Sequence, residues 1–219
     1  DYAKTKLFDR IQLTLPPIIY QRRISHYIDF ALIKSGFKYN KREVSSIMHI
    51  ENTLEKCLNK FKSNHRRAVK KAIKSGIKIK ISNDYKTFYK ILEQNLSIRH
   101  NVKPTHTLSE LQKLKLLFPD SIYLFGAFLD DKMIAGVINF IINNKVVLAF
   151  YISHNESYQE MRPINLIFYN IIDWAIHNQF SILDFGIFTI NEIPNMGLAR
   201  FKENFGSSGV FRETVELNI

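Results

Sequence analysis

The sequence predicts an α+β fold (α/β mixed), in which a central, mostly antiparallel, twisted sheet is flanked by helices. Three apolar runs of strand length follow one another between residues 122 and 153, and only short turn signals separate them, as in an antiparallel meander. Stretches with apolar residues three and four positions apart precede and follow these runs and predict helices. The 219 residues, of which 46% are hydrophobic, are enough for one large domain with a real core.

Residues 1–53 are predicted to form a strand, a helix and a second strand. Arg10–Leu15 alternates apolar and polar residues and is followed by two prolines, which cannot donate to a strand ladder. Arg23–Ser35 is predicted to be a helix that a glycine ends, and Val44–Ile50 a short strand. A segment of this size is too small for a core of its own, so we expect it to pack on the residues that follow.

Leu54–Ser75 is predicted to be one amphipathic, strongly basic helix. Its apolar residues recur at spacings of three and four, and cations fill the other faces. Neighbouring cations repel one another, and either phosphates of a partner or water and salt would relieve that repulsion. The best candidates for contact with phosphate or nucleic acid are Arg66, Arg67, Lys70 and Lys71.

The positive charge of the protein is concentrated in its first third. Residues 1–80 contain 19 Lys+Arg and 6 Asp+Glu, whereas residues 81–219 contain 12 and 14. The net charge of +11 therefore belongs to the first region alone. Such asymmetry favours a polyanionic partner, which could be nucleic acid, an acidic membrane surface or a phosphorylated substrate, and a solubilising surface is the alternative.

The remaining elements are predicted in the order β-α-α-β-β-β-α-β-α-β. Asp84 is placed to cap the first of these helices, and Thr107 with Glu110 forms a capping-box pattern before the second. The predicted bounds are 77–81, 84–99, 107–117, 122–129, 133–142, 146–153, 163–177, 182–185, 197–204 and 209–217.

The element order resembles that of the GNAT acyltransferase superfamily, and several motifs resemble its Fem-type branch. That branch includes the peptidoglycan bridge peptidyltransferases and GNAT-like proteins of polysaccharide loci. The resemblance covers residues 54–219. The motifs that carry it are the run from Arg66 to Ala72, Phe118-Pro119, Ala127-Phe128, Ile134–Val137, Asp184-Phe185-Gly186 and Gly197–Gly206.

The resemblance implies a GNAT-like acyltransferase domain at residues 54–219, preceded by a partial GNAT-like repeat at residues 1–53. It implies transfer of an acyl or aminoacyl group to an amine of a small-molecule or lipid-linked cell-envelope precursor, which is a sugar or a peptide. No tightly bound cofactor is expected, and acyl-CoA or aminoacyl-tRNA would serve as co-substrate. An alternative is a non-catalytic module that binds nucleic acid or an anionic lipid-linked glycan through the basic helix.

Acyl transfer to an amine needs close reactants, a route for the amine proton and positive charge at the developing oxyanion. The resemblance places Lys202 in the substrate channel. Asp184 ends a buried strand, where it could act as a base or satisfy the backbone of the turn at Gly186. His100 is a candidate proton shuttle on the loop between two predicted helices. Lys202, Asp184 and His100 are thus the catalytic candidates.

Four further residues are candidates for substrate binding. Arg200 lies two positions before Lys202, so on a helix the two side chains point to different faces. His106 flanks a loop in which GNAT-like folds often bind the acceptor. Tyr151 and Asn165 could line the cleft of such a fold.

The stretch Ser153–Pro163 departs from the pattern of GNAT enzymes that use acetyl-CoA. Those enzymes hold the pyrophosphate on backbone N–H groups of a glycine-bearing loop at a helix N-terminus. This stretch contains no glycine and two glutamates, and only Arg162 favours a phosphate. The sequence therefore disfavours conventional CoA binding.

Other classes of protein fit the sequence less well. A single cysteine, Cys57, excludes a disulfide framework, and the seven histidines form no helical pair that suggests a metal site. The longest apolar runs, such as Ile134–Ile142, are shorter than the ~20 residues of a membrane span. We expect a cytoplasmic protein with possible tRNA or peripheral membrane contact, and the oligomeric state stays open.

Overall fold

The computed structural model describes residues 2–100 and 103–219, apart from the side chains of residues 99 and 100. It contains helices, two short 3-10 turns and strands in alternation. The helical elements are α1 (Tyr2–Thr5), η1 (Ile18–Tyr20), α2 (Tyr27–Lys34), α3 (Leu54–Lys60), α4 (Ser63–Lys74), α5 (Tyr85–His100), α6 (Leu108–Leu117), η2 (Glu156–Met161), α7 (Pro163–His177) and α8 (Met196–Glu203). The strands are β1 (Arg10–Thr14), β2 (Lys38–His49), β3 (Lys78–Ser82), β4 (Ile122–Leu129), β5 (Lys132–Ile141), β6 (Val146–His154), β7 (Ile182–Ile187), β8 (Thr189–Ile190), β9 (Ile193–Pro194) and β10 (Ser208–Asn218).

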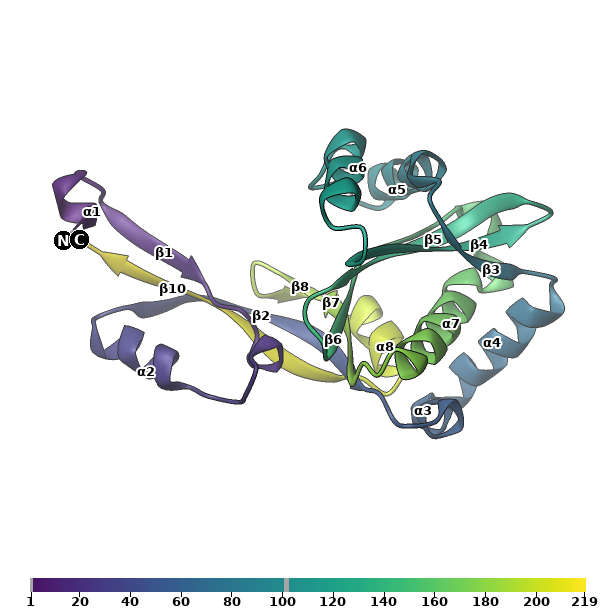
Figure 1. Cartoon of the computed structure of the whole chain (residues 1–219), viewed down its shortest axis with the longest axis horizontal. Coiled ribbons are helices and arrows are strands. Elements are labelled where there is room, and N and C mark those ends of the chain that lie inside the picture. The colour runs from purple at the N-terminus through teal and green to yellow at the C-terminus, as the bar shows by residue number, and fades with distance from the viewer. Residues whose placement is uncertain (1, 101–102) are drawn as a thin grey trace.

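One long sheet runs through the molecule in the order β1-β10-β2-β7-β6-β5-β4-β3 (Figure 1). Throughout the described chain, neighbouring strands of this sheet are antiparallel except β6 and β7, which are parallel. The predicted α+β class, with a mostly antiparallel sheet and flanking helices, is therefore confirmed.

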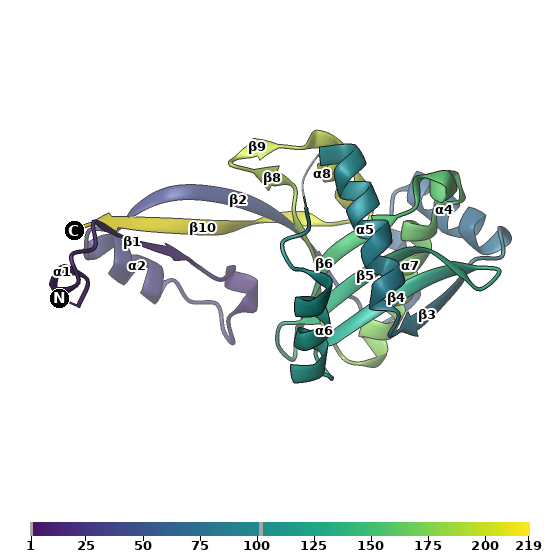
Figure 2. The same ribbon diagram turned by 90° about the horizontal axis from the view of Figure 1, so that it is seen from above.

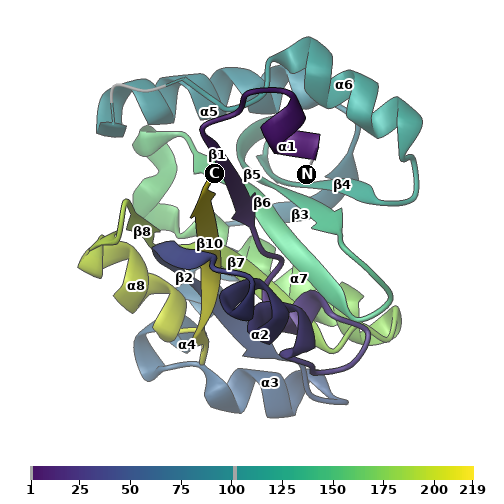
Figure 3. The same ribbon diagram turned by 90° about the vertical axis from the view of Figure 1, so that its left-hand side faces the viewer.

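Helices cover both faces of this sheet and create two apolar cores. α5 and α6 lie on one face, whereas α3, α4 and α7 lie on the other (Figures 2 and 3). The larger core joins the second group of helices to the inner strands, and the smaller core lies under α5 and α6. α7 is the most apolar helix because it is buried in the larger core. Among the described residues, no helix has the length and apolar character to cross a membrane.

The meander of β4, β5 and β6 forms where the apolar runs predict it. The turn between β4 and β5 places Asp130 and Asp131 at positive φ, as a tight hairpin turn requires. The capping box of Thr107 and Glu110 at α6 is formed, and Asp84 accepts a hydrogen bond from the backbone N–H of Thr87 at the start of α5. Local sequence signals thus determine this half of the molecule.

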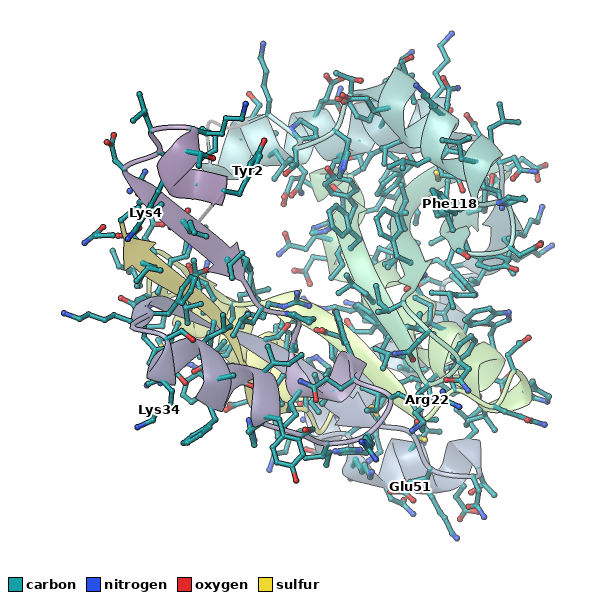
Figure 4. All side chains as sticks on the ribbon, turned by 60° about the vertical axis from the view of Figure 1, so that its left-hand side comes forward. Tyr2, Lys4, Arg22, Lys34, Glu51 and Phe118 are labelled. Atoms are coloured by element: carbon teal, nitrogen blue, oxygen red, sulfur yellow. The ribbon has the colours of Figure 1, made fainter. Side chains whose placement is uncertain are left out.

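The N-terminal and C-terminal segments form an arm of the sheet beside the main body. β10 lies between β1 and β2, and α1 and α2 accompany these strands on the left of Figure 1. The side chains of Tyr2, Lys4 and Lys34 project from this arm in Figure 4, and no described residue of α2 is buried. Within the arm, β2 is longer than the predicted strand at 44–50, and α2 is shorter than the predicted helix at 23–35.

The prediction of one continuous helix over residues 54–75 is wrong. The chain forms α3 and α4, because Phe61 and Lys62 adopt extended backbone angles between them. Phe61 is buried against Phe205, and the Lys62 N–H donates to the Asn204 carbonyl at 2.9 Å. This packing against the end of α8 outweighs the helical periodicity of the sequence.

The hairpin of β8 and β9 was not predicted from the sequence. Its two-residue turn has Asn191 and Glu192 at positive φ. The buried Glu43 carboxylate accepts hydrogen bonds from the N–H groups of both residues, at 2.8 and 3.4 Å. The hairpin is therefore held by a side chain that is about 150 residues away in the sequence.

Gly206 ends the turn between α8 and β10, and we predict that Gly206→Ala strongly destabilises the fold. Gly206 has φ +83°, and an added Cβ would lie 2.5 Å from the Lys60 Cβ and 2.9 Å from the Lys60 carbonyl oxygen. We expect a loss of about 3 kcal/mol in the free energy of unfolding, measured by urea denaturation.

Gly76→Ala is the matched control. Gly76 has φ +78° but no atom within 4 Å of an added Cβ, so only the backbone cost of about 1 kcal/mol applies. Equal losses in the two variants would contradict the proposed close packing at Gly206.

Candidate functional site

The sheet opens at its one parallel pair of strands. β6 and β7 are paired only from Val146 to Leu148 and from Ile182 to Asp184. Beyond these residues the strands separate, and the side chains and backbone of Ala149 and Phe185 border a cavity. Such a point in a sheet is a common place for a ligand, because backbone and side chains converge there without closing the space.

The cavity has a volume of about 860 Å³. It reaches from α5 through the gap between β6 and β7 to α8 and the start of α7. Its polar lining residues are Asn95, Lys103, Thr105, Tyr151, His154, Gln159, Arg162, Asn165, Asn195 and Lys202.

A β-bulge on β6 shapes the cavity wall. Ile138 of β5 is opposite Tyr151, whereas the next residue, Asn139, is opposite Ala149, so Phe150 is an extra residue in β6. Both Phe150 and Tyr151 consequently pack toward the core under α5 and α6. The bulge thereby brings the Tyr151 side chain to the edge of the cavity.

Lys202 provides a buried positive charge in the wall of the cavity. Its side chain is directed inward from α8, and the residue is only 2% exposed. The ammonium donates to the carbonyls of Gly186 (2.8 Å) and Ile187 (2.6 Å) at the end of β7. Burial lowers the pKa of Lys202 to about 8, while the Asp184 carboxylate acts to raise it and the Arg212 guanidinium acts to lower it.

The N-terminus of α7 forms a second polar part of the lining. Asn165 is 4% exposed and lines the cavity, and its side-chain Nδ2 has no hydrogen-bond partner among the described residues. A buried N–H without an acceptor is costly, so a ligand oxygen at this position would stabilise it.

The loop before α7 lacks two of the free backbone N–H groups that a pyrophosphate cradle would use. Arg162 has φ 60° and ψ 43°, a left-handed conformation that is strained for a residue before proline. Pro163 has no N–H, and the N–H of Asn165 is bonded to the Arg162 carbonyl at 3.2 Å. The prediction that this stretch departs from a conventional CoA site agrees with this geometry.

Tyr151 and His106 form a hydrogen-bonded pair next to the cavity. The Tyr151 hydroxyl accepts from the His106 N–H at 3.0 Å and lies 3.0 Å from His106 Nδ1. The Tyr89 hydroxyl donates to the His106 carbonyl at 3.1 Å, which fixes the loop on this side. Tyr151 is 8% exposed and lines the cavity, whereas His106 lies behind it and outside the lining.

Asp184 is placed behind the cavity rather than in it. The residue is fully buried, and it lies outside the lining that the described residues form. Its carboxylate accepts from the N–H of Gly186 (2.7 Å), from Ser45 (2.7 Å), from Tyr20 (2.8 Å) and from Arg212 (2.8 Å). Both oxygens are therefore occupied, which supports the second predicted role of Asp184, satisfying the turn at Gly186.

Arg200, another predicted residue, is not brought to the cavity. Arg200 is exposed on the opposite side of α8 from Lys202 and lies outside the described lining. This placement agrees with the helical spacing of the two residues. The side chain of His100, at the end of α5, lies outside the described residues, so the prediction for it remains a prediction.

The predicted phosphate-binding cations lie on the outer face of α4, where Arg66, Arg67, Lys70 and Lys71 are exposed. Glu160 of η2 connects this face to the cavity lining. Its carboxylate lies 3.7 Å from the Lys71 ammonium and 3.5 Å from the Arg162 guanidinium. The basic face of α4 therefore adjoins the cavity lining at Arg162.

Sequence reasoning missed the partners of Asp184 and the contribution of α5. Tyr20, Ser45 and Arg212 are distant from Asp184 in the sequence, and no motif connects them. Asn95 lies in the cavity wall and donates to the His154 carbonyl (3.1 Å) and the Glu156 carboxylate (2.9 Å). Its position beside leucines on the inner face of α5 is the signal that could have identified it.

The cavity therefore combines the open end of a parallel strand pair, the N-terminus of a helix and a buried cation in one site of a mixed α/β domain. A family model described as "Acetyltransferase (GNAT) domain" matches residues 59–203. The chain therefore belongs to the GNAT acetyltransferase family, as its resemblance predicted.

Solved structures share this fold at low sequence identity. The structure of FemX has a TM-score of 0.78 and 14% identity, and the match covers 100% of this chain and 74% of that chain. The C-terminal domain of a putative lysylphosphatidylglycerol synthetase from Agrobacterium fabrum has a TM-score of 0.69 and 11% identity, with 99% and 70% covered.

A tandem GNAT protein from the clavulanic acid biosynthesis pathway has a TM-score of 0.56 and 8% identity, and the match covers 99% of this chain and 66% of that chain. No curated protein matches the sequence. At these identities the structural matches show a shared fold.

We predict that Asp184→Ala destabilises the protein by about 3–5 kcal/mol, because it leaves the Arg212 guanidinium and three other donors without their acceptor. Urea denaturation measures this loss. The control is Glu216→Ala, which removes a carboxylate paired at 3.5 Å with the well-exposed Arg10 on the same sheet. A loss of at most about 1 kcal/mol is expected there, and similar losses in the two variants would contradict the structural role of Asp184.

Proposed function

We propose that this protein is an N-acyltransferase that transfers an acyl or aminoacyl group from an activated donor to an amine of a cell-envelope sugar or peptide precursor. The observation that carries the proposal is the buried Lys202 ammonium in the wall of the cavity between β6 and β7. Membership of the GNAT family supports the reaction class. The putative lysylphosphatidylglycerol synthetase domain, whose name describes a lysyl group carried by a phospholipid, supports an envelope substrate and an aminoacyl group, as does the Fem-type resemblance of the sequence.

The chemistry is attack of the amine nitrogen on the acyl carbonyl carbon. A C–N bond forms, negative charge develops on the carbonyl oxygen, and the donor leaves with the electron pair of the broken bond. Two of the three N–H donors of Lys202 are bonded to the backbone carbonyls of Gly186 and Ile187. We assign the third to the developing oxyanion, where a fixed cation in a buried site stabilises the transition state.

The attacking amine must also lose a proton. The Tyr151 hydroxyl lies at the cavity edge, and its contact with His106 Nδ1 offers a relay from the amine through the hydroxyl to the imidazole. Asn165, whose Nδ2 has no hydrogen-bond partner among the described residues, would bind an oxygen of the substrate. Asn165 is thus proposed for the substrate-binding role that the sequence predicted, whereas Tyr151 and His106, also predicted to bind substrate, are proposed for the proton relay.

The acyl donor carries phosphate in either proposed form, acyl-CoA or aminoacyl-tRNA. The loop at Arg162 and Pro163 does not fit the backbone cradle of a pyrophosphate. The exposed cations of α4 adjoin the cavity lining through Glu160, which favours a larger polyanion that follows this face. The same face supports the alternative function, binding of nucleic acid or an anionic lipid-linked glycan without catalysis.

We predict that Lys202→Met lowers kcat/KM about 100-fold or more, because an oxyanion donor is lost. The assay uses radiolabelled acetyl-CoA and tRNA charged with labelled amino acids as donors, and an amino sugar and a peptidoglycan pentapeptide precursor as acceptors. The matched control is Lys115→Met. The Lys115 ammonium also donates to two backbone carbonyls, those of Pro119 and Ile122, but lies away from the cavity.

The pH profile gives a second result from the same assay. The lowered pKa of Lys202, about 8, means that its ammonium loses its proton as the pH rises above 8, so kcat/KM should fall there. In Lys202→Arg the charge persists, and the fall should move to higher pH. If Lys202→Met leaves kcat/KM unchanged, the proposed role of Lys202 in stabilising the oxyanion is contradicted.

The donor is tested by charge reversal on α4. We predict that Arg67→Glu/Lys70→Glu weakens binding of bulk tRNA at least tenfold at low salt, because two phosphate contacts are lost and reversed. Lys34→Glu/Lys38→Glu, the same charge change on the arm, is the control. Filter binding over a salt series measures the effect, and calorimetry measures acetyl-CoA binding.

The two donors give opposite results in this experiment. If acetyl-CoA binds with micromolar affinity and the α4 charge reversal does not change that affinity, the proposal that the donor is a larger polyanion is contradicted. tRNA binding without transfer from charged tRNA would favour the non-catalytic module.

A further inference from the structure

A continuous path of hydrogen bonds leads from the arm to the Lys202 ammonium. Arg212 on β10 donates from Nη2 to the Asp184 carboxylate at 2.8 Å, and the Tyr20 hydroxyl donates to the same oxygen at 2.8 Å. The other carboxylate oxygen accepts from the Gly186 N–H at 2.7 Å. The carbonyl of Gly186 then accepts from the Lys202 ammonium at 2.8 Å.

The groups in this path also hold one another. Arg212 donates to the Tyr20 hydroxyl and to the Ser45 hydroxyl, the latter at 3.3 Å from Nε. Ser45 donates to Asp184 at 2.7 Å. The guanidinium lies over the Tyr20 ring, 5.1 Å from its centroid. The donors to the buried carboxylate are thus also linked to one another through Arg212.

Three of these groups come from the arm of the sheet, in which we include η1 because it lies between β1 and α2 in the chain. Tyr20 belongs to η1, Ser45 to β2 and Arg212 to β10, and all three lie outside the lining that the described residues give the cavity. Gly186 has φ +75°, a conformation that the bond from its N–H to Asp184 supports. The arm therefore determines the shape of the turn that directs two carbonyls at Lys202.

We propose that Tyr20 and Arg212 are positioning residues for the cavity, which hold the Asp184 carboxylate and thereby fix the turn at Gly186 and the Lys202 ammonium. On this proposal the arm is part of the functional machinery as well as of the sheet. The catalytic part of this proposal rests on the role proposed for Lys202 in acyl transfer. The geometry itself is tested without substrate.

The charged groups that act on Lys202 from the packed elements are Asp184 on β7 and Arg212 on β10. From η1 and β2 the network contributes only the hydroxyls of Tyr20 and Ser45. Arg212 opposes the charge of Asp184, so its removal strengthens the attraction of the carboxylate for the Lys202 proton and ends the repulsion by the guanidinium. Both changes raise the pKa of Lys202.

The experiment follows the titration of Lys202 by NMR in protein labelled with 13C at the lysine ε-carbons. The Lys202 signal is assigned by its loss in Lys202→Arg, and its midpoint is measured from pH 6 to 11. Wild type is expected to titrate near 8. Arg212→Gln should raise the midpoint by about one unit and Tyr20→Phe by about half a unit.

A double variant and a matched control complete the design. Asp184→Asn/Arg212→Gln removes both charges, so its midpoint should lie below that of Arg212→Gln. Arg10→Gln removes a cation from an exposed pair on the same sheet and should leave the midpoint unchanged. If Arg212→Gln does not fold, Tyr20→Phe decides.

Folded Tyr20→Phe and Arg212→Gln proteins with midpoints within about 0.2 unit of wild type would overturn the proposal. The titration is independent of any acyl donor, so failure of the proposed transferase activity leaves this result intact. Conversely, if the Lys202 midpoint does not change in these variants, the role of Lys202 in acyl transfer is still tested independently by the activity assay.

Discussion

The short parallel pairing of β6 and β7 is the constraint on which the site depends. The two strands hydrogen bond from Val146 to Leu148 on β6 and then separate, and the cavity begins at the next residue. The bulge at Phe150 adds to this separation because it turns two successive side chains toward α5 and α6. The space therefore follows from strand geometry, and side chains from both helical layers only complete its walls.

Polar groups around the opening are divided between two tasks. Lys202 and Asn165 have donors that the protein does not fully use, and both residues line the cavity. Asp184, in contrast, has all its acceptor capacity directed to the protein and stabilises the turn behind Lys202. A buried acid next to a site is thus better explained here by backbone support than by proton transfer.

Local patterns predicted much of the fold. The meander, the capping box at Thr107 and the buried helix from Pro163 to His177 all formed where apolar periodicity and turn residues placed them. The break between α3 and α4 was missed because a hydrogen bond from Lys62 to Asn204 stabilises it, and these residues are far apart in the sequence. The hairpin of β8 and β9 was missed for the same reason, since Glu43 holds its turn.

The sequence by itself determined the α+β class, the order of most elements and the concentration of positive charge in the first third. These features depend on composition and on contacts between near neighbours in the chain. Only the tertiary structure decided that β10 lies between β1 and β2, that Asp184 faces Tyr20 and Arg212, and that Arg200 lies outside the cavity lining of the described residues. Those outcomes depend on strand pairing and burial between distant segments. A local sequence pattern does not specify which distant strands pair or in which register.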